Sequence, residues 1–190
     1  MNIANQLTLA RILLVFVFMG VIWNPWLGLP MTLWIALGIF VVASFTDFLD
    51  GYLARKYQLV TNLGKFMDPL ADKMLVTAAM IAIVDMSGVL PAGSLPTWIV
   101  VVILLREFAV SGLRLVAASE NIVIAAGSLG KIKTIVQMMM IIVYLAPINL
   151  SFWSLLATLL AYAALILTVV SGAQYLWENR KVFITQKKSR

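Results

Sequence analysis

Long apolar stretches follow one another along the sequence, each close to the length that an α-helix needs to cross a bilayer. The segments between them carry proline, a residue that marks turns, at positions 25, 30, 91, 96 and 147. The pattern predicts six helices, over approximately Leu7 to Trp23, Met31 to Arg55, Met67 to Met86, Pro96 to Ala118, Lys131 to Ala146 and Phe152 to Glu178. We therefore expect an all-α integral membrane protein with six transmembrane helices.

Composition and charge placement favour the same class of protein. Hydrophobic residues make up 63% of the chain and charged residues 12%, against about 25% charged in soluble domains. Lysine and arginine are absent from residues 24–30, 87–96 and 147–151. By the positive-inside rule, both termini and the basic connections face the cytosol of a multi-pass protein of the cell (plasma) membrane. The net charge of +6 indicates contact with anionic lipid and not with nucleic acid.

The sequence contains no cysteine and no histidine. Disulfides, iron–sulfur clusters and thiolate zinc sites are therefore excluded, and so is an imidazole base. A bound metal must be held mainly by oxygen ligands, which favours Mg²⁺, Mn²⁺ or Ca²⁺. The candidate ligands are the chain's eight acidic residues.

Four of these acidic residues lie between positions 47 and 72, in the pattern D-x2-D-G-x2-A-R-x8-G-x3-D-x3-D. Asp47 and Asp50 are three residues apart and share one face of the second predicted helix. Asp68 and Asp72 are four residues apart and share one face of the third. The short connection makes these helices antiparallel neighbours, with a cytosolic cleft between the carboxylate pairs. Two divalent cations about 3.5–4 Å apart would relieve the repulsion between the carboxylates and would serve phosphoryl transfer.

The residues around the aspartates fit this interpretation. Gly51 and Ala54 leave space for a ligand, and Arg55 can bind phosphate through its planar guanidinium. We expect Gly64 to permit the turn into the third helix and Pro69 to lie in the first turn of that helix. The alternative is that the aspartates are helix caps and charge partners of nearby basic residues. This alternative is disfavoured because four aspartates occur at these spacings in a chain with few acidic residues.

The same stretch matches, at every defined position, the signature of the CDP-alcohol phosphatidyltransferase family, which the chain resembles over nearly its whole length. The resemblance implies one membrane domain over residues 1–190 and a reaction in which an alcohol hydroxyl attacks the lipid-linked phosphorus of a CDP-activated lipid, releasing CMP. It also implies a homodimer and Mg²⁺ or Mn²⁺ as cofactor, with two ions in each active site.

Roles follow from the resemblance by position. Asp47, Asp50 and Asp68 would be the main metal ligands. Asp72 would bind the second metal and act as the general base, which is also the natural role for a carboxylate in a chain without histidine. The residues that the resemblance places against the CDP moiety are Asp47, Gly51, Ala54, Arg55 and Thr8.

Three further segments, residues 5–11, 106–114 and 130–137, resemble bacterial phosphatidylglycerophosphate synthases within this family. They imply CDP-diacylglycerol as donor and glycerol 3-phosphate as acceptor. A phosphate-bearing acceptor needs cationic groups, and these segments supply Arg11, Arg106, Arg114, Lys131 and Lys133. We expect Glu107 to pair with a neighbouring arginine and to have no catalytic role.

Alternatives stay open at this point. The basic side chains could extend to the membrane interface without binding the acceptor. The same chemistry could use inositol phosphate, serine or phosphatidylglycerol as the acceptor. A protein of another class, a divalent-cation transporter, is disfavoured because the aspartates cluster at cytosolic helix ends and not at the bilayer midplane. The remaining apolar helices are expected to hold acyl chains and a dimer contact.

Overall fold

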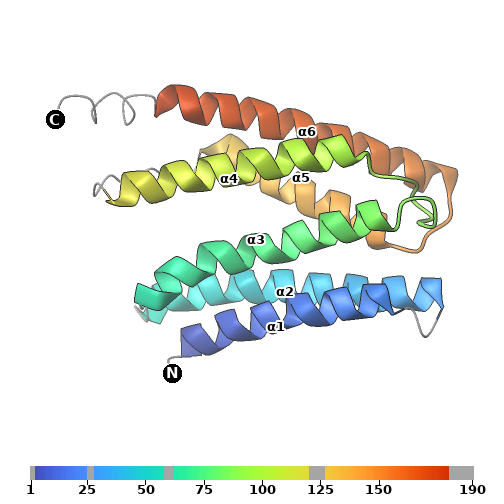
Figure 1. The fold of residues 1–190 in the computed structure, drawn as a ribbon, viewed down its shortest axis with the longest axis horizontal. Helices are drawn as coiled ribbons and strands as arrows, with labels where there is room; N and C mark the ends of the chain where they lie inside the picture. The colour runs from blue at the N-terminus through green and yellow to red at the C-terminus, as the bar shows by residue number, and fades with distance from the viewer. Residues whose placement is uncertain (1–2, 25–27, 58–61, 120–126, 180–190) are drawn as a thin grey trace. The chain divides into compact units, whose positions relative to one another are not determined.

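The structure, a computed structural model, describes residues 3–24, 28–57, 62–119 and 127–179, with side chains from residue 9 onward except at positions 47–72. These residues form six α-helices and no strand (Figure 1). The bounds are α1 Ile3–Trp23, α2 Leu29–Tyr57, α3 Asn62–Asp85, α4 Thr97–Ser119, α5 Ser128–Leu145 and α6 Ser151–Glu178. The six predicted helices are confirmed, with bounds within a few residues of those expected.

The start of α3 differs from the prediction. The helix begins at Asn62, so Gly64 lies within its first turn and Pro69 lies further inside the helix. The expectations that Gly64 makes the turn and that Pro69 occupies the first turn are therefore wrong. The first N–H groups of a helix need no intrahelical acceptor, so the helix can start before Gly64 at little cost. Pro69, in contrast, has no backbone N–H, so it cannot make the helical hydrogen bond to the backbone carbonyl of Lys65.

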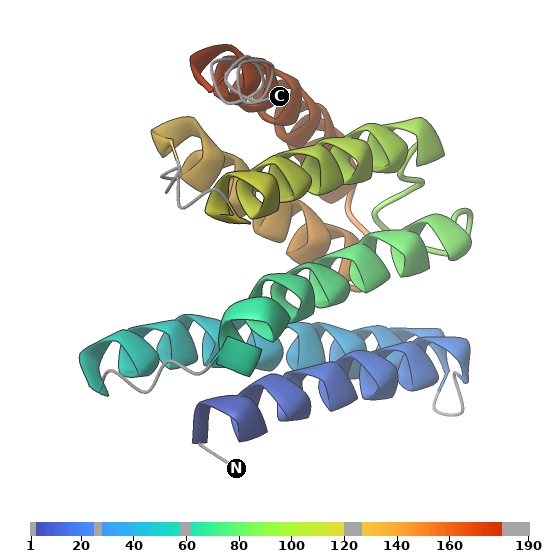
Figure 2. The same cartoon turned by 60° about the vertical axis from the view of Figure 1, so that its left-hand side comes forward.

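The first of two compact units contains α1, α2 and α3 together with residues 141–155. Here α1 packs against both α2 and α3, and α2 packs against α3. Figure 2 shows α3 crossing the pair formed by α1 and α2. Phe18 of α1, Phe40 of α2 and Ile83 of α3 have no exposed surface. This apolar packing keeps together the two helices that carry the four aspartates.

The second unit contains α4 and the greater parts of α5 and α6, residues 128–140 and 156–178. In α6 the buried residues follow helical spacing, with one adjacent pair, and they are Ala157, Ala161, Ala164, Thr168, Ser171, Gly172 and Tyr175. This spacing places them on one helical face, and small side chains let a neighbouring helix approach closely. Val110 and Leu113 of α4 cluster with Tyr175. The small and polar face of α6 is therefore turned toward α4.

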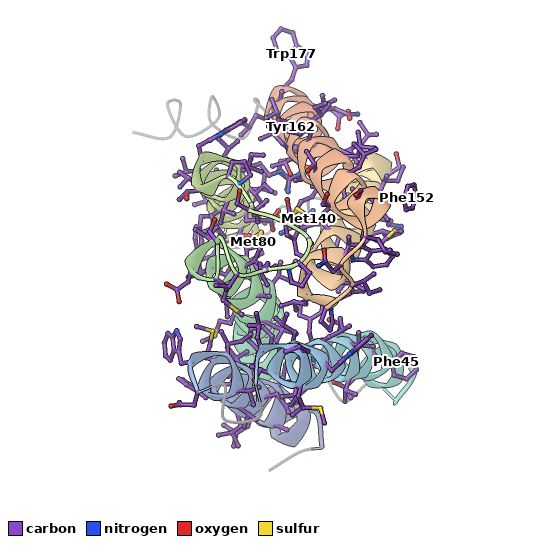
Figure 3. All side chains as sticks on the ribbon, turned by 90° about the vertical axis from the view of Figure 1, so that its right-hand side faces the viewer. Phe45, Met80, Met140, Phe152, Tyr162 and Trp177 are labelled. Atoms are coloured by element: carbon purple, nitrogen blue, oxygen red, sulfur yellow. The ribbon has the colours of Figure 1, made fainter. Side chains whose placement is uncertain are left out.

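The outer surface of the helices is apolar. Phe45, Phe152 and Trp177 are 63%, 69% and 72% exposed, and their side chains point away from the helices (Figure 3). Within the described residues, three helical segments are long and apolar enough to cross a membrane, and they are Leu29–Thr46, Ser128–Leu145 and Ser151–Glu178. Lipid is the solvent that such a surface requires, and the chain is a membrane protein.

Candidate active site

The four aspartates lie on two neighbouring helices of the first unit. Asp47 and Asp50 are in the C-terminal half of α2, and Asp68 and Asp72 are in the N-terminal half of α3. The continuous helical backbone places each pair on one helical face, as predicted, and the two helices are in contact. The aspartate side chains lie outside the described residues, so the arrangement of the carboxylates stays a prediction.

The chemistry of this donor set fits Mg²⁺ or Mn²⁺. Carboxylates are the hard oxygen ligands that these ions prefer, and the chain offers no histidine or cysteine that would favour a softer metal. The residues that would hold the ions are Asp47, Asp50, Asp68 and Asp72. Their positions on two adjacent helices are those that a shared site requires.

The residues expected to contact CDP lie on α1 and α2. Gly51, Ala54 and Arg55 belong to α2 and Thr8 belongs to α1, with side chains outside the described residues. Arg11, three positions after Thr8, is only 4% exposed. A buried guanidinium is costly unless an anion accompanies it. Because α1 packs against both aspartate-bearing helices, the buried guanidinium of Arg11 lies in the same unit as the four aspartates.

In the second unit, one carboxylate joins two cations. The Nη1 atom of Arg106 donates to Oε1 of Glu107 over 3.1 Å, and Nζ of Lys133 donates to the same oxygen. The Lys133 side chain is 3% exposed and that of Glu107 is 19% exposed, so water screens this pair little. The expectation that Glu107 pairs with a neighbouring arginine is confirmed. Lys133, predicted to bind the acceptor phosphate, has its amine against this carboxylate.

Arg106 also reaches from α4 to α6. Its Nη2 atom donates to Oγ of Ser171 over 3.0 Å. The Ser171 hydroxyl in turn donates to the backbone carbonyl of Thr168 over 3.3 Å. The middle of the Arg106 side chain lies against Gly172, where an added Cβ would come within 2.9 Å of the arginine Cγ. The arginine is thus fixed by residues of two different helices.

Arg114, eight positions after Arg106 on α4, is also held by α6. Its Nε atom donates to the hydroxyl of Tyr175 over 3.1 Å. Its guanidinium carbon lies 5.3 Å from the centre of the Tyr175 ring, within cation–π range. One tyrosine therefore engages this arginine through both its hydroxyl and its ring.

The two arginines line one pocket within the second unit. Its lining comes from all three helices and consists of Arg106, Arg114, Gly127, Leu129, Gly130, Ser171, Gln174, Tyr175 and Glu178. The amide of Gln174 donates to Oε1 of Glu178 over 2.7 Å, so this carboxylate oxygen already accepts one hydrogen bond. The start of α5 also borders the pocket, and a helix N-terminus favours anions. Lys131 is exposed, and neither it nor Lys133 belongs to the lining.

The contribution of α6 is the part of this pocket that the sequence analysis missed. Hydropathy predicts only an apolar span here, one of those expected to hold acyl chains and a dimer contact. The available signal was the recurrence of Thr168, Ser171, Gly172 and Tyr175 at helical spacing in an otherwise apolar stretch. A polar stripe on a membrane helix indicates polar partners on a neighbouring helix.

Residues 1–170 match the family described as CDP-alcohol phosphatidyltransferase. The chain belongs to this family. A Bacillus subtilis (strain 168) protein named CDP-diacylglycerol–glycerol-3-phosphate 3-phosphatidyltransferase is 42% identical, over 94% of this chain and 95% of that protein. A Rickettsia bellii protein with the same name is 36% identical over 185 residues, covering 96% and 97%. A Mycobacterium tuberculosis protein named probable phosphatidylglycerophosphate synthase is 37% identical over 174 residues, covering 92% and 79%.

The CDP-alcohol phosphatidyltransferase match includes the helices that carry the aspartates and the helix that carries Arg106 and Arg114. It ends at residue 170, immediately before Ser171. The residues of α6 that hold the two arginines therefore lie just beyond the part of the chain that the family match covers.

Proposed function

We propose that this chain transfers the phosphatidyl group of CDP-diacylglycerol to the hydroxyl of sn-glycerol 3-phosphate, giving phosphatidylglycerol phosphate and CMP in phospholipid biosynthesis. The observation that carries the proposal is the 42% identity, over 94% of the chain, to the Bacillus subtilis protein whose name states this activity. The pocket that Arg106 and Arg114 line supports the proposal, because this acceptor bears a phosphate that arginine recognises well.

The reaction forms one phosphorus–oxygen bond and breaks another. The acceptor hydroxyl oxygen bonds to the phosphorus that carries the diacylglycerol. The bond from this phosphorus to the oxygen of CMP breaks, and CMP leaves with the electron pair. Asp72 takes the proton of the hydroxyl. Asp47, Asp50, Asp68 and Asp72 would hold divalent ions, which would neutralise the charge on the phosphate oxygens.

Donor binding is assigned to the same helices. Arg55 would hold a phosphate of the CDP group, with Thr8 and Asp47 as polar contacts. Gly51 and Ala54 would let the nucleotide approach the backbone of α2, because neither side chain extends far from the helix. These assignments rest on the family motif and on the position of the residues in α1 and α2.

Acceptor binding is assigned to the cations of the second unit. Arg106 and Arg114 would bind the phosphate of glycerol 3-phosphate, since both line the pocket. Lys133 would support Arg106 through the carboxylate that both cations share. Arg11 of α1 and Lys131 of α5 are assigned to the acceptor phosphate by the family resemblance alone.

The membrane arrangement that goes with this function has six crossings, with both termini and the active-site cleft on the cytosolic side of the plasma membrane. The chain has no lysine or arginine in residues 24–30, 87–96 and 147–151, which supports this topology. The protein would act as a homodimer. Cysteine scanning with an impermeant thiol reagent tests the topology, since the native chain has no cysteine to interfere.

The test of function is CMP release by the purified protein in detergent. Reactions contain CDP-diacylglycerol and Mg²⁺ or Mn²⁺, with glycerol 3-phosphate present or omitted. The variant Asp72→Asn removes the base without changing the size of the side chain. Asp85→Asn is a matched control, because Asp85 lies at the exposed end of the same helix and outside the motif.

The expected result is release that requires both metal and acceptor, is abolished by Asp72→Asn and persists in Asp85→Asn. Release with inositol phosphate, serine or phosphatidylglycerol alone would retain the chemistry and reject the acceptor. A folded protein that releases no CMP with any alcohol would reject the enzyme, and metal flux into liposomes would then be measured.

A further inference from the structure

The guanidinium of Arg106 is held from two sides. Nη1 is bonded to Glu107 on the same helix, and Nη2 is bonded to Ser171 on α6. These two bonds fix the plane of the guanidinium. Each terminal nitrogen carries two hydrogens, so each keeps one N–H for a ligand. Arg106 lines the pocket, and a guanidinium with N–H donors to spare binds phosphate oxygens well.

The Ser171 hydroxyl has a defined orientation. It donates its hydrogen to the carbonyl of Thr168, which leaves its lone pairs free to accept from Arg106. The Ser171 side chain is buried, at 4% exposure, so water does not compete for this contact. The serine therefore presents an acceptor to the arginine at a fixed position on α6.

Gly172 provides the space in which the arginine lies. A Cβ atom at this position would come within 2.9 Å of Cγ, 3.4 Å of Nε and 3.8 Å of Cδ of Arg106. These atoms form the middle of the side chain and not its flexible tip. Any side chain at position 172 would therefore displace the arginine along its length, because a carbon–carbon contact of 2.9 Å is shorter than van der Waals packing allows.

We propose that Ser171 and Gly172 of α6 are positioning residues that set the Arg106 guanidinium for recognition of the acceptor phosphate. Gly172 admits the arginine stem across the helix, and Ser171 fixes the orientation of its tip. The inference deepens the proposed function and rests on it for the identity of the acceptor. It makes α6 a determinant of acceptor affinity, although the two residues themselves contact the arginine and not the reacting atoms.

The first test is Gly172→Ala, measured by steady-state kinetics of CMP release. Alanine favours a helix more than glycine does, so the variant does not weaken α6 itself. The expected result is a rise of about tenfold or more in KM for glycerol 3-phosphate, the effect of misplacing a charge-assisted hydrogen bond. The KM for CDP-diacylglycerol should stay within about twofold. Gly38→Ala is the matched control, since Gly38 lies within α2 and a Cβ there would meet nothing within 4 Å.

The second test compares two hydroxyl deletions on the same helix. Ser171→Ala removes the acceptor for Arg106, and about a fivefold rise in KM for glycerol 3-phosphate is expected. Thr168→Val removes a fully buried hydroxyl that has no hydrogen-bond partner among the described residues, so no rise is expected. Because both changes delete one oxygen from one face of α6, a general loss of packing would affect them alike.

Unchanged KM for the acceptor in Gly172→Ala, or equal changes in both KM values, would overturn the positioning role. The wild-type protein separates this failure from failure of the proposed function. If the wild type releases CMP only with another phosphate-bearing alcohol, the proposed acceptor is rejected. The KM for that alcohol in Gly172→Ala then tests the positioning role in its place, with a rise supporting the role and no rise overturning it.

Discussion

The Nη2 atom of Arg106 lies 3.0 Å from the Oγ atom of Ser171, 65 residues later in the chain. A second link, between Lys133 and Glu107, connects α5 to the same turn of α4. The three helices of this unit are therefore joined by charged and polar side chains at the level of the pocket. Since Arg106 also donates to Glu107, a change at either residue affects both links.

Replacing Arg114 by glutamine should weaken binding of the acceptor and leave donor binding unaffected. Arg114 lines the pocket and is held by Tyr175. Loss of its charge should raise KM for glycerol 3-phosphate about tenfold or more, with little change in KM for CDP-diacylglycerol. Lys188→Gln removes the same charge at a position that is assigned to neither substrate, and it is the control. An equal rise in both variants would assign the effect to long-range charge and not to the pocket.

Tyr175→Phe should separate the two contacts that this tyrosine makes with Arg114. The substitution removes the hydroxyl that accepts from Nε and retains the ring under the guanidinium. A rise of about threefold in acceptor KM is expected, the effect of one lost hydrogen bond. Tyr162→Phe is a matched control on the same helix, where the ring lies against Trp98. If both variants behave alike, the Tyr175 hydroxyl does not position Arg114.

Glu107→Gln should destabilise the protein, because the Lys133 side chain is 3% exposed and would lose the carboxylate that its amine contacts. Breaking such a buried pair costs about 3 kcal/mol, which corresponds to a fall of roughly 5 °C or more in the unfolding midpoint. Thermal unfolding in detergent measures the effect. The double variant Glu107→Gln with Lys133→Met should regain part of the loss, since no buried lysine is left uncompensated. Additive losses would show that the two residues are not coupled.

Removal of divalent metal should abolish turnover without abolishing acceptor binding. The candidate metal ligands belong to α2 and α3, whereas Arg106 and Arg114 belong to α4. After chelation, CMP release should fall to background and return on addition of Mg²⁺ or Mn²⁺. Glycerol 3-phosphate should still raise the thermal unfolding midpoint of the chelated protein. Loss of that shift on chelation would place the metal in the acceptor site.

Hydropathy and proline placement were sufficient to predict all six helices. Apolar segments of this length are expected where lipid surrounds a helix, and prolines mark the turns between the segments. The start of α3 was mispredicted, since Gly64 and Pro69 are common at helix boundaries but are tolerated within this helix. The pairing of Glu107 with Arg106 follows from their adjacency. The contact with Lys133 does not, because helical periodicity describes one helix and says nothing of which residue a second helix brings to it.

The same limit explains why the sequence predicts only an apolar span for α6. Averaged over its length, α6 is strongly apolar, and the average conceals a stripe of small and polar residues. Gly172 in particular has no side chain to signal a role, and its importance appears only when the Arg106 side chain is placed against it. The arrangement of the four aspartate side chains stays a prediction, supported by their spacing on α2 and α3.

Ser171 and Tyr175 are four residues apart, about one helical turn, and each engages a different arginine of α4. Rotating α6 by a single residue, about 100°, would turn both partners away together. Apolar side chains give lipid no preference between the faces of a helix. The two arginines therefore specify which face of α6 is turned inward when the helices assemble in the bilayer, in addition to any role in catalysis.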